Sequence, residues 1–289
     1  MTYIEHYRQL AAALPGNDLP WLRDLRESAE ARFTASGFPA PHEEDWRYTP
    51  LAPLTKTLFL PGNSSLTDRT LLDQHRLPNT WTLVFVNGAF SSDLSDLAGL
   101  QQTVTALPIT EALVRQPEQL QHSLLQSIEP THGLMDFNRA YFSNGAFIHI
   151  PDNIVLKKPI QLLHLSTQKE GLAILRHAIC LGRHAQAQII ETWAGATDEI
   201  YLNAAVTGIA LAEGSQLEHY KLQTESAKAY HFGGVYADQA RTARFSQHHA
   251  SFGGLIARTE IHTKLGEGAE CDMDGLFLAT GRQHLDTHT

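Results

Sequence analysis

Cysteine is scarce in this chain of 289 residues, which contains only Cys180 and Cys271. The two cysteines lie far apart, and neither forms part of a CxxC pair. This spacing excludes a disulfide framework and a zinc knuckle built on paired cysteines, and it is typical of proteins from a reducing compartment. The first residues also lack the apolar core of a secretory signal peptide. The sequence therefore predicts a cytoplasmic protein.

Basic residues and long apolar runs are also few. The chain has 22 Lys and Arg against 31 Asp and Glu, which gives a formal net charge of −9 at pH 7. Without a basic run, nucleic acid and anionic membranes are disfavoured as partners. No apolar stretch reaches the ~18 residues that a membrane-spanning helix needs. A phosphate-binding loop and a dinucleotide glycine motif are missing too, so any use of ATP is expected to come from a partner.

One short phrase recurs four times in the second half of the chain. The copies begin at Leu181, Leu211, Tyr236 and Leu265, at nearly regular spacing. In each copy an apolar residue leads, two small or polar residues turn the chain, and Ala or Ser follows four positions after the lead. Such spacing indicates one supersecondary unit that is repeated and stacked.

The residues between the turns alternate between polar and apolar types, as in QIIETW (188–193) and EHYKL (218–222). This alternation predicts strands with one face on a core, and no helical pattern separates them. We predict a mainly β fold, a right-handed parallel β-helix (β-solenoid) with an N-terminal α-helical region. Two domains are expected: an N-terminal helical and mixed α/β region over residues 1–145, and a β-helix core over 146–289 that is incomplete at its C-terminal end.

Helical patterns occur in the first half. Residues 2–14 place their apolar side chains on one face, and the next helix is expected to have Asp18 as its N-cap and Pro20 in its first turn. Together these two amphipathic helices predict a hairpin that serves packing. Another helical pattern covers 109–128, with a break expected at Pro117.

The segment GFPAPHEEDWRYTPL (37–51) follows the hairpin. Its prolines favour an extended chain, and Trp46 and Tyr48 alternate with charged residues. Glu43, Glu44 and Asp45 are a candidate carboxylate cluster, but adjacent residues do not converge easily on one atom. The preferred interpretation is a surface strap anchored by its aromatic side chains.

Histidine supplies the candidate metal ligands. His248 and His249 are neighbours on a predicted strand, so at most one of them can join a given site. His284 and His288 are four residues apart and share a face, yet two imidazoles alone make a weak site. A metal site would need ligands from adjacent coils, such as His219, His231 or His262. Solvated or core histidines are the preferred interpretation.

The remaining candidates are cysteines and acids. Cys271 stands six positions after its repeat lead, where the other copies carry Ala187, Leu217 and Thr242, and it is expected to pack inward rather than to act as a thiolate ligand. Cys180 is interpreted in the same way. Asp272 and Asp274 share one face, which leaves open an alternative function as a β-helix carbohydrate-active enzyme of the polysaccharide lyase type. A surface adhesin would require secretion.

Three segments resemble the SufB/SufD family of the SUF iron–sulfur cluster assembly system. Residues 37–51 are similar to the N-terminal signature of SufD proteins, G-(F/L)-P-x-x-x-x-E-(D/N)-W-(K/R)-Y-T-P-L. Residues 83–90 (LVFVNGAF) resemble the strand and turn of that family. Residues 145–151 and 158–164 resemble its entry into the β-helix. The resemblance spans nearly the whole chain.

The resemblance implies a non-enzymatic scaffold that pairs through its β-helix with a SufB-like paralogue. Each partner in the family binds one copy of the ATPase SufC through helices that follow the β-helix, and a transient Fe–S cluster forms at the SufB–SufD interface. The family's interface ligands lie after the segment that matches residues 275–289, so this chain is expected to stop before them and not to bind SufC. No catalytic, cofactor-binding or metal-binding residue is therefore assigned.

Overall fold

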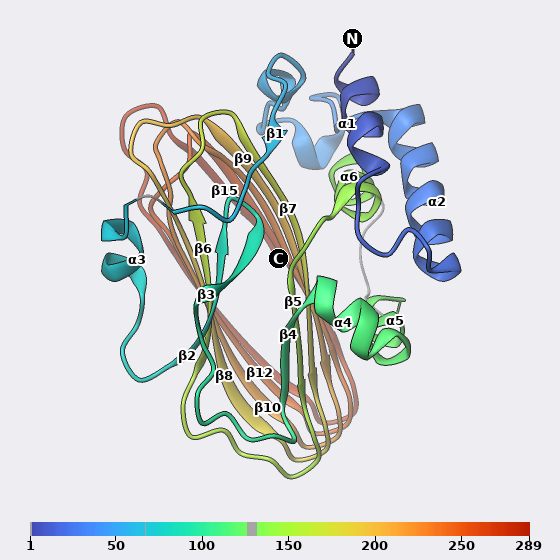
Figure 1. Ribbon diagram of the computed structural model, residues 1–289, viewed down its shortest axis with the longest axis vertical. Helices are drawn as coiled ribbons and strands as arrows, with labels where there is room; N and C mark the ends of the chain where they lie inside the picture. Colours follow the sequence, from blue (N-terminus) through green and yellow to red (C-terminus); the bar gives the residue numbers. More distant parts are fainter. Residues whose placement is uncertain (1, 67, 126–131) are drawn as a thin grey trace.

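The fold is a β-solenoid of about five turns with helices packed on its outside, as a computed structural model shows (Figure 1). The structure describes residues 2–66, 68–125 and 132–289. The predicted mainly β solenoid with N-terminal helices is confirmed. Within the described residues, no helix combines the length and the apolar character that crossing a bilayer requires.

Two sheets form the walls of the solenoid, and the chain alternates between them after β5. The first, sheet A, has the order β15-β13-β11-β9-β7-β5-β4, with β1 paired to β7. Its strands are β1 (Leu60–Pro61), β4 (Thr105–Pro108), β5 (Ala146–Ile150), β7 (Gly171–Leu181), β9 (Tyr201–Leu211), β11 (Tyr230–Gln239), β13 (Ile256–Leu265) and β15 (His284–His288).

The second sheet, sheet B, has the order β14-β12-β10-β8-β6-β2-β3. Its strands are β2 (Trp81–Val86), β3 (Ala89–Asp96), β6 (Ile160–Ser166), β8 (Gln186–Gly195), β10 (Gln216–Thr224), β12 (Arg244–Ser251) and β14 (Glu270–Phe277). Pairing is parallel except between β2 and β3 and between β4 and β5. Strands from before residue 146 therefore belong to both sheets.

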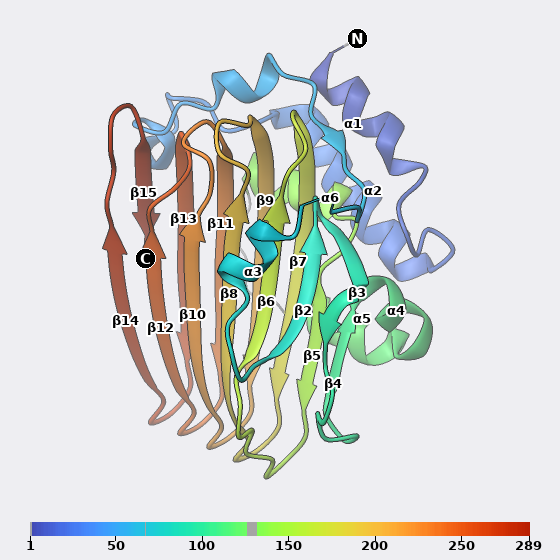
Figure 2. The ribbon, with the colours of Figure 1, turned by 60° about the vertical axis from the view of Figure 1, so that its left-hand side comes forward.

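Most of the helices lie against the outer face of sheet A, whereas α3 lies on sheet B (Figures 1 and 2). An aromatic-rich core that includes Tyr7, Phe33 and Phe137 joins the helices to β7 and β9. The helices are α1 (Tyr3–Ala11), α2 (Pro20–Ser36), α3 (Thr70–His75), α4 (Ile109–Arg115), α5 (Pro117–Leu125) and α6 (Gly133–Tyr141), with 3-10 turns at Glu44–Trp46 and Ala52–Thr55.

The helix predictions are confirmed in outline. The break expected at Pro117 separates α4 from α5, and the end predicted for that pattern, 126–128, lies outside the described residues. The N-cap expected at Asp18 is wrong, because Leu19 occupies that position and makes no side-chain cap. Pro20 needs no amide donor at the first helical position, so the helix begins there without a polar cap.

The predicted start of the third repeat is wrong. Strand register aligns Leu181 and Leu211 with Gln239 and Leu265, so the third copy begins at Gln239 rather than Tyr236. The error arises because Gln239 is polar at a position where the other copies carry leucine, although its side chain is buried. Phe245, not Thr242, is consequently the equivalent of Cys271.

Apolar side chains fill one part of the space between the sheets. Leu83, Ile148, Ile179, Ile209 and Phe245 belong to this cluster, and the partly buried Cys271 packs against it, as the sequence predicts. Burial of this kind contributes roughly 25 cal/mol for each Å² of apolar surface. The remaining interior carries polar side chains.

Gly145 is the glycine for which we predict the largest effect on stability. Its φ is +148°, and a Cβ there would collide with the backbone carbonyl of Arg176. We expect Gly145→Ala to lower the free energy of unfolding by about 3 kcal/mol, measured by urea denaturation. Gly275→Ala on β14 is the matched control, because a Cβ there meets nothing within 4 Å. A change of less than about 0.5 kcal/mol for both variants would contradict the prediction.

Candidate functional site

A cluster of polar and ionisable side chains lies inside the solenoid, in its middle coils. The parallel register of sheet B produces this cluster. Glu191, Lys221 and His249 are register partners on adjacent strands. His164, Trp193 and Gln223 form the next inward row. Sheet A contributes side chains from β7, β9 and β11. The interior polar cluster comprises His164, His177, Glu191, Asn203, Thr207, His219, Lys221, Gln223, Glu225, His231, Gln247 and His249, each at most 5% exposed.

Glu191 has three polar partners within this cluster. Its carboxylate accepts a hydrogen bond from Trp193 Nε1 at 3.1 Å and another from the hydroxyl of Thr207, and it lies 3.0 Å from His219 Nε2. Burial opposes ionisation, but the hydrogen bond and charge of His219, with the charge of Lys221, outweigh it. They hold the pKa of Glu191 well below its usual range. Glu191 is therefore a buried carboxylate anion.

Glu225 is a second enclosed carboxylate, about which three side chains gather. Asn203 Nδ2 and Gln223 Nε2 donate to its two oxygens at 2.5 and 2.9 Å, and His231 Nδ1 lies 2.7 Å from Oε2. Burial acts against the charge, yet His231 and the two amides lower the pKa of Glu225. Both carboxylates thus have partners on neighbouring coils, as buried charges require.

Lys221 adds a buried primary amine on which the charges of both carboxylates act. Its Nζ lies 5.7 Å from the centre of the Trp193 ring, close enough for a cation–π contact. Gly233 on the facing sheet makes room for it, because a Cβ at that position would overlap Nζ. Burial lowers the pKa of Lys221, while the charges of Glu191 and Glu225 oppose that shift.

Imidazoles and aromatic rings pack beside the charged groups. His164 stacks on Trp193 with a centroid separation of 3.8 Å, and its other face meets Phe85 at 5.0 Å. Burial lowers the pKa of His164 well below its ordinary value, that of His177 to about 4 and that of His249 to about 3. These three rings are consequently neutral at pH 7.

The interior polar cluster holds its charged groups in a fixed, enclosed arrangement. Its groups are shielded from solvent, and each carboxylate is committed to several donors. Among residues 2–66, 68–125 and 132–289, no group of three or more His, Cys, Asp or Glu side chains has the geometry to hold a metal ion. The assignment of no catalytic, cofactor or metal residue stays a prediction.

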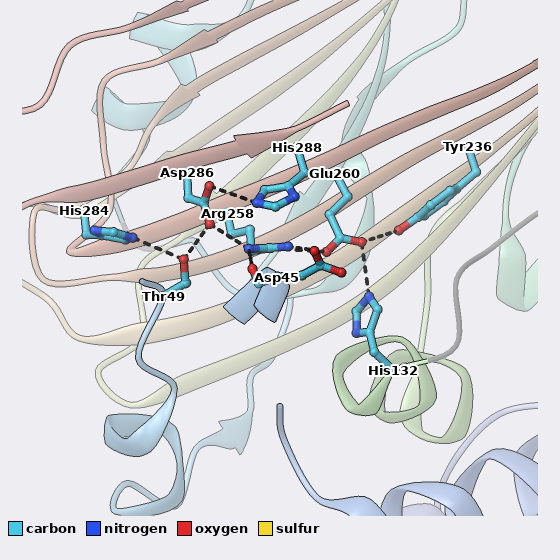
Figure 3. A network of polar contacts seen from close by, with 9 residues as sticks. All are labelled: Asp45, Thr49, His132, Tyr236, Arg258, Glu260, His284, Asp286 and His288. Atoms are coloured by element: carbon cyan, nitrogen blue, oxygen red, sulfur yellow. Dashed lines mark hydrogen bonds and ion pairs between the residues drawn. The ribbon is translucent and has the colours of Figure 1, made fainter. Parts of the chain in front are cut away.

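A second polar network fastens the strap of residues 37–51 to the outer face of sheet A (Figure 3). Arg258 on β13 is its centre. The guanidinium lies 3.8 Å from the centre of the Trp46 ring, donates to the carbonyl of Asp45 at 2.6 Å and pairs with Asp286 at 2.7 Å. A bond of Thr49 to Asp286 holds the end of the strap on β15.

Glu260 continues this network toward α6. It pairs with Arg258 and accepts a hydrogen bond from Tyr236 at 3.0 Å, and its Oε2 lies 3.1 Å from His132 Nε2 (Figure 3). Burial resists the charge of this carboxyl, but His132, Arg258 and Tyr236 lower the pKa of Glu260 to about 2. One strand pair thus binds both the strap and the helical layer.

The strap prediction is confirmed for one aromatic side chain only. Trp46 is buried, whereas Tyr48 is 76% exposed and lies beside Arg47. The segment is also less extended than its prolines indicate, because Glu44–Trp46 form a 3-10 turn. Burial of the indole ring under Arg258 favours this turn, which brings the carbonyl of Asp45 to the guanidinium. Glu43, Glu44 and Asp45 do not converge on one site.

The histidine candidates are distributed over both faces. His248 points outward and His249 inward, as alternation requires, while His219 and His231 belong to the interior polar cluster. The exposed His262 stacks on Tyr236 outside sheet A. The face shared by His284 and His288 is confirmed, and these rings contact Thr49 and Asp286 rather than each other.

The cysteine and aspartate candidates also lie apart. Cys180 faces α5, where its Sγ is 3.1 Å from the hydroxyl of Ser123, and burial raises the pKa of its thiol. Cys271 is inside, and burial raises the pKa of that thiol as well. Asp272 and Asp274 share the outer face of sheet B, as the sequence predicts.

Glu191, Lys221 and Glu225 are not among the candidate residues that the sequence suggests. A signal was present for the first two, because they stand in the same alternation phase as the inward residues Ile189 and Leu217. Charged residues in an inward phase require partners on adjacent coils. Glu225 follows the end of β10, where alternation stops, so nothing in the sequence marks it as buried.

Comparisons with known proteins agree along the whole chain. The family described as "SufBD protein N-terminal region" matches residues 1–162, and "SUF system FeS cluster assembly, SufBD core domain" matches residues 164–289. An iron–sulfur cluster assembly SufBD family protein of Synechocystis is 26% identical over 96% of this chain and 64% of its own length. The iron–sulfur cluster assembly protein SufD of Escherichia coli is 24% identical over 88% of this chain and 59% of its own. The chain thus spans about three fifths of the length of these relatives.

We predict that Glu191→Gln destabilises the fold strongly. The amide preserves shape but removes the charge that His219 and Lys221 face, which should lower the free energy of unfolding by about 3 kcal/mol in urea denaturation at pH 7. Glu218→Gln is the matched control on the neighbouring strand, where the exposed carboxylate is expected to contribute less than about 0.5 kcal/mol. Equal effects of the two substitutions would contradict the interpretation.

Acid should destabilise the chain through its buried imidazoles. The pKa values of His177 and His249 are lowered to about 4 and about 3 in the folded chain. Above pH 6.5 both rings are therefore neutral in the folded and in the unfolded chain, and they do not make the free energy of unfolding depend on pH. Below pH 6.5 the unfolded chain takes up protons first, and stability falls by up to ~1.4 kcal/mol per pH unit for each ring. Urea denaturation from pH 7 to pH 4 should show a shallower fall for His249→Asn. His262→Asn, which alters an exposed ring, is the control. Its free energy of unfolding should fall with pH as steeply as that of the parent chain.

Proposed function

Because the chain belongs to the SufB/SufD family of SUF iron–sulfur cluster assembly proteins, we propose that it acts as a non-enzymatic scaffold component of cluster assembly. The observation that carries this proposal is the match of both family regions, in order, over residues 1–162 and 164–289. The enclosed charges of the solenoid support a structural role, because each lies at most 5% exposed.

We further propose pairing with a SufB-like paralogue through the β-helix. Exposed apolar side chains gather at the end of β14 and just after it, where Leu276 and Leu278 are each 61% exposed and Phe277 is 56% exposed. Apolar groups of this kind on a protein surface favour association. The Fe–S cluster is the cargo of the assembled complex in this proposal, formed transiently where the two subunits meet.

The ATPase SufC is proposed to bind a part of the longer relatives that this chain does not span. The 289-residue chain is then expected to enter a complex containing SufC only when a SufB-like subunit brings the ATPase with it. The two partners can therefore be tested separately, because the contact with the SufB-like subunit needs the β-helix and the contact with SufC does not.

Co-purification tests this proposal. The chain is expressed with the SufB-like and SufC proteins of the same genome, together and in pairs, and the complexes are sized by light scattering. We expect a complex with SufB, with or without SufC, and no complex with SufC alone. Phe277→Asp should weaken the SufB complex at least tenfold. The control Val114→Asp changes an 81% exposed residue on α4 and should not.

Anaerobic reconstitution with iron and sulfide gives an independent measure. The isolated chain should acquire no stoichiometric, strongly absorbing cluster. A stable cluster on the chain alone, or tight binding of SufC to it, would overturn the corresponding part of the proposal.

A further inference from the structure

The outer face of sheet B is covered over only part of its width. In Figure 2, α3 lies across β6 and β8, while β10, β12 and β14 present the same face without a helix in front of them. The covered part is a small apolar core in which Leu72 of α3 contacts the outward residues of β2, β6 and β8. Leu72 itself is 1% exposed.

One row of side chains under α3 continues into the uncovered part, and Thr192 is its one polar member. Register aligns Val84, Leu163 and Thr192, which lie under or beside α3, with Leu222. The same row then runs through Ala250 to Leu276, which is 61% exposed. The mostly apolar row that binds α3 on β2, β6 and β8 therefore continues onto β10, β12 and β14, which α3 does not cover.

A groove of about 660 Å³ follows this row over four strands. Its outward-facing lining includes Ile190, Tyr220, Leu222, His248, Ala250 and Leu276. Tyr220 and His248 stack with their ring centroids 4.8 Å apart, and Asp274 fixes His248 through a contact of 3.1 Å with Nδ1. These contacts give the groove one aromatic wall that is ordered before any ligand binds.

We propose that this groove binds an amphipathic helix of a partner protein, with a leucine-rich face and basic residues along one edge. The groove shares Leu276 with the β14 surface proposed above for the SufB-like subunit, whereas Ile190, Tyr220 and Leu222 lie on β8 and β10. The inference does not rest on that pairing, because a basic peptide is expected to bind the isolated chain. The groove occupies a different surface from the solenoid interior and the strap.

The spacing of the strands favours a helix as the occupant. Neighbouring strands lie ~4.8 Å apart, and a helix rises ~5.4 Å per turn. A helix that crosses the strands therefore places one apolar side chain per turn, at i, i+3 or i+4 and i+7, over β10, β12 and β14 in succession. An added β-strand would need free backbone groups, which the face of a paired sheet does not offer.

Charge selects the kind of helix. One flank of the groove carries Glu218, Asp272 and Asp274 in adjacent outward rows, and Asp274 is 77% exposed. The neighbouring Arg244 is already paired with Glu270. A basic helix edge complements this flank, whereas a second copy of this chain or an anionic membrane would bring like charges together.

Fluorescence anisotropy with model peptides tests the proposal on the intact chain. The probe is a labelled amphipathic peptide of Leu and Lys, about four helical turns long, compared with a peptide that keeps the leucines and replaces Lys by Glu. We expect the Lys peptide to bind at least tenfold more tightly than the Glu peptide at low salt. Binding should weaken as salt increases.

Variants then locate the site. Leu222→Asp with Leu276→Asp should reduce affinity for the Lys peptide at least tenfold, since both changes lie on an exposed or half-exposed face. Val114→Asp is the matched control for adding an acidic group elsewhere and should leave affinity unchanged. Asp272→Asn with Asp274→Asn should weaken binding and reduce its dependence on salt. Circular dichroism of each variant checks that the solenoid remains folded.

Each other outcome overturns the proposal. Equal binding by the Leu222 and Leu276 double variant shows that the peptide binds elsewhere, and equal binding of the Glu peptide removes the selection by charge. If the parent chain sediments as a dimer and the double variant sediments as a monomer, the groove binds a second copy of the chain. If the parent chain binds phosphatidylserine vesicles and the double variant does not, the groove binds a membrane surface.

Discussion

In the stacked coils of the solenoid, a side chain faces inward or outward together with its register partners on the neighbouring coils, because the strands that follow β5 pair in parallel. An inward charge therefore draws several of its partners from other coils and from the opposite sheet. Glu191 meets His219 from the next coil and Thr207 from the opposite sheet, and Glu225 meets Asn203 and His231 across the interior. The polar interior is a consequence of register.

The same rule shapes the outer surface. On sheet A, the outward residues Arg258 and Glu260 are register partners of Asp286 and His288 on the next strand. The strap therefore binds to a row of charged side chains. The strap, from the first part of the sequence, thereby fixes β13 and β15 from its last part. On sheet B, one apolar row begins under α3 and continues past it. Outer faces built in this way offer continuous surfaces to other elements or proteins.

The scaffold function proposed above is consistent with such a construction. Enclosed charge pairs are costly to desolvate, and they favour one arrangement of coils over others because a shift in register would leave each carboxylate without its partners. In that proposal, rigid coils with ordered outer rows hold partner subunits at fixed positions.

Much of the architecture could be predicted from the sequence. Alternation in residues 188–193 and 218–222, with glycine-containing turns at regular spacing, indicates stacked strands because these patterns are local. The strap motif and the break at Pro117 are local as well. The start of the third repeat could not be placed correctly, because Gln239 breaks the apolar pattern and only strand register identifies its partners Leu211 and Leu265.

The candidate site depended on tertiary structure. Local alternation assigns Glu191 and Lys221 to an inward phase, but it cannot say that His219, Thr207 and Trp193 complete the carboxylate's partners, since these come from three strands on two sheets. Trp46 and Arg258 are distant in sequence, yet the guanidinium lies 3.8 Å from the centre of the indole ring. By itself the sequence determined the period, the strands and the family. Only the tertiary structure decided which charges meet, because that depends on the stacking of distant coils.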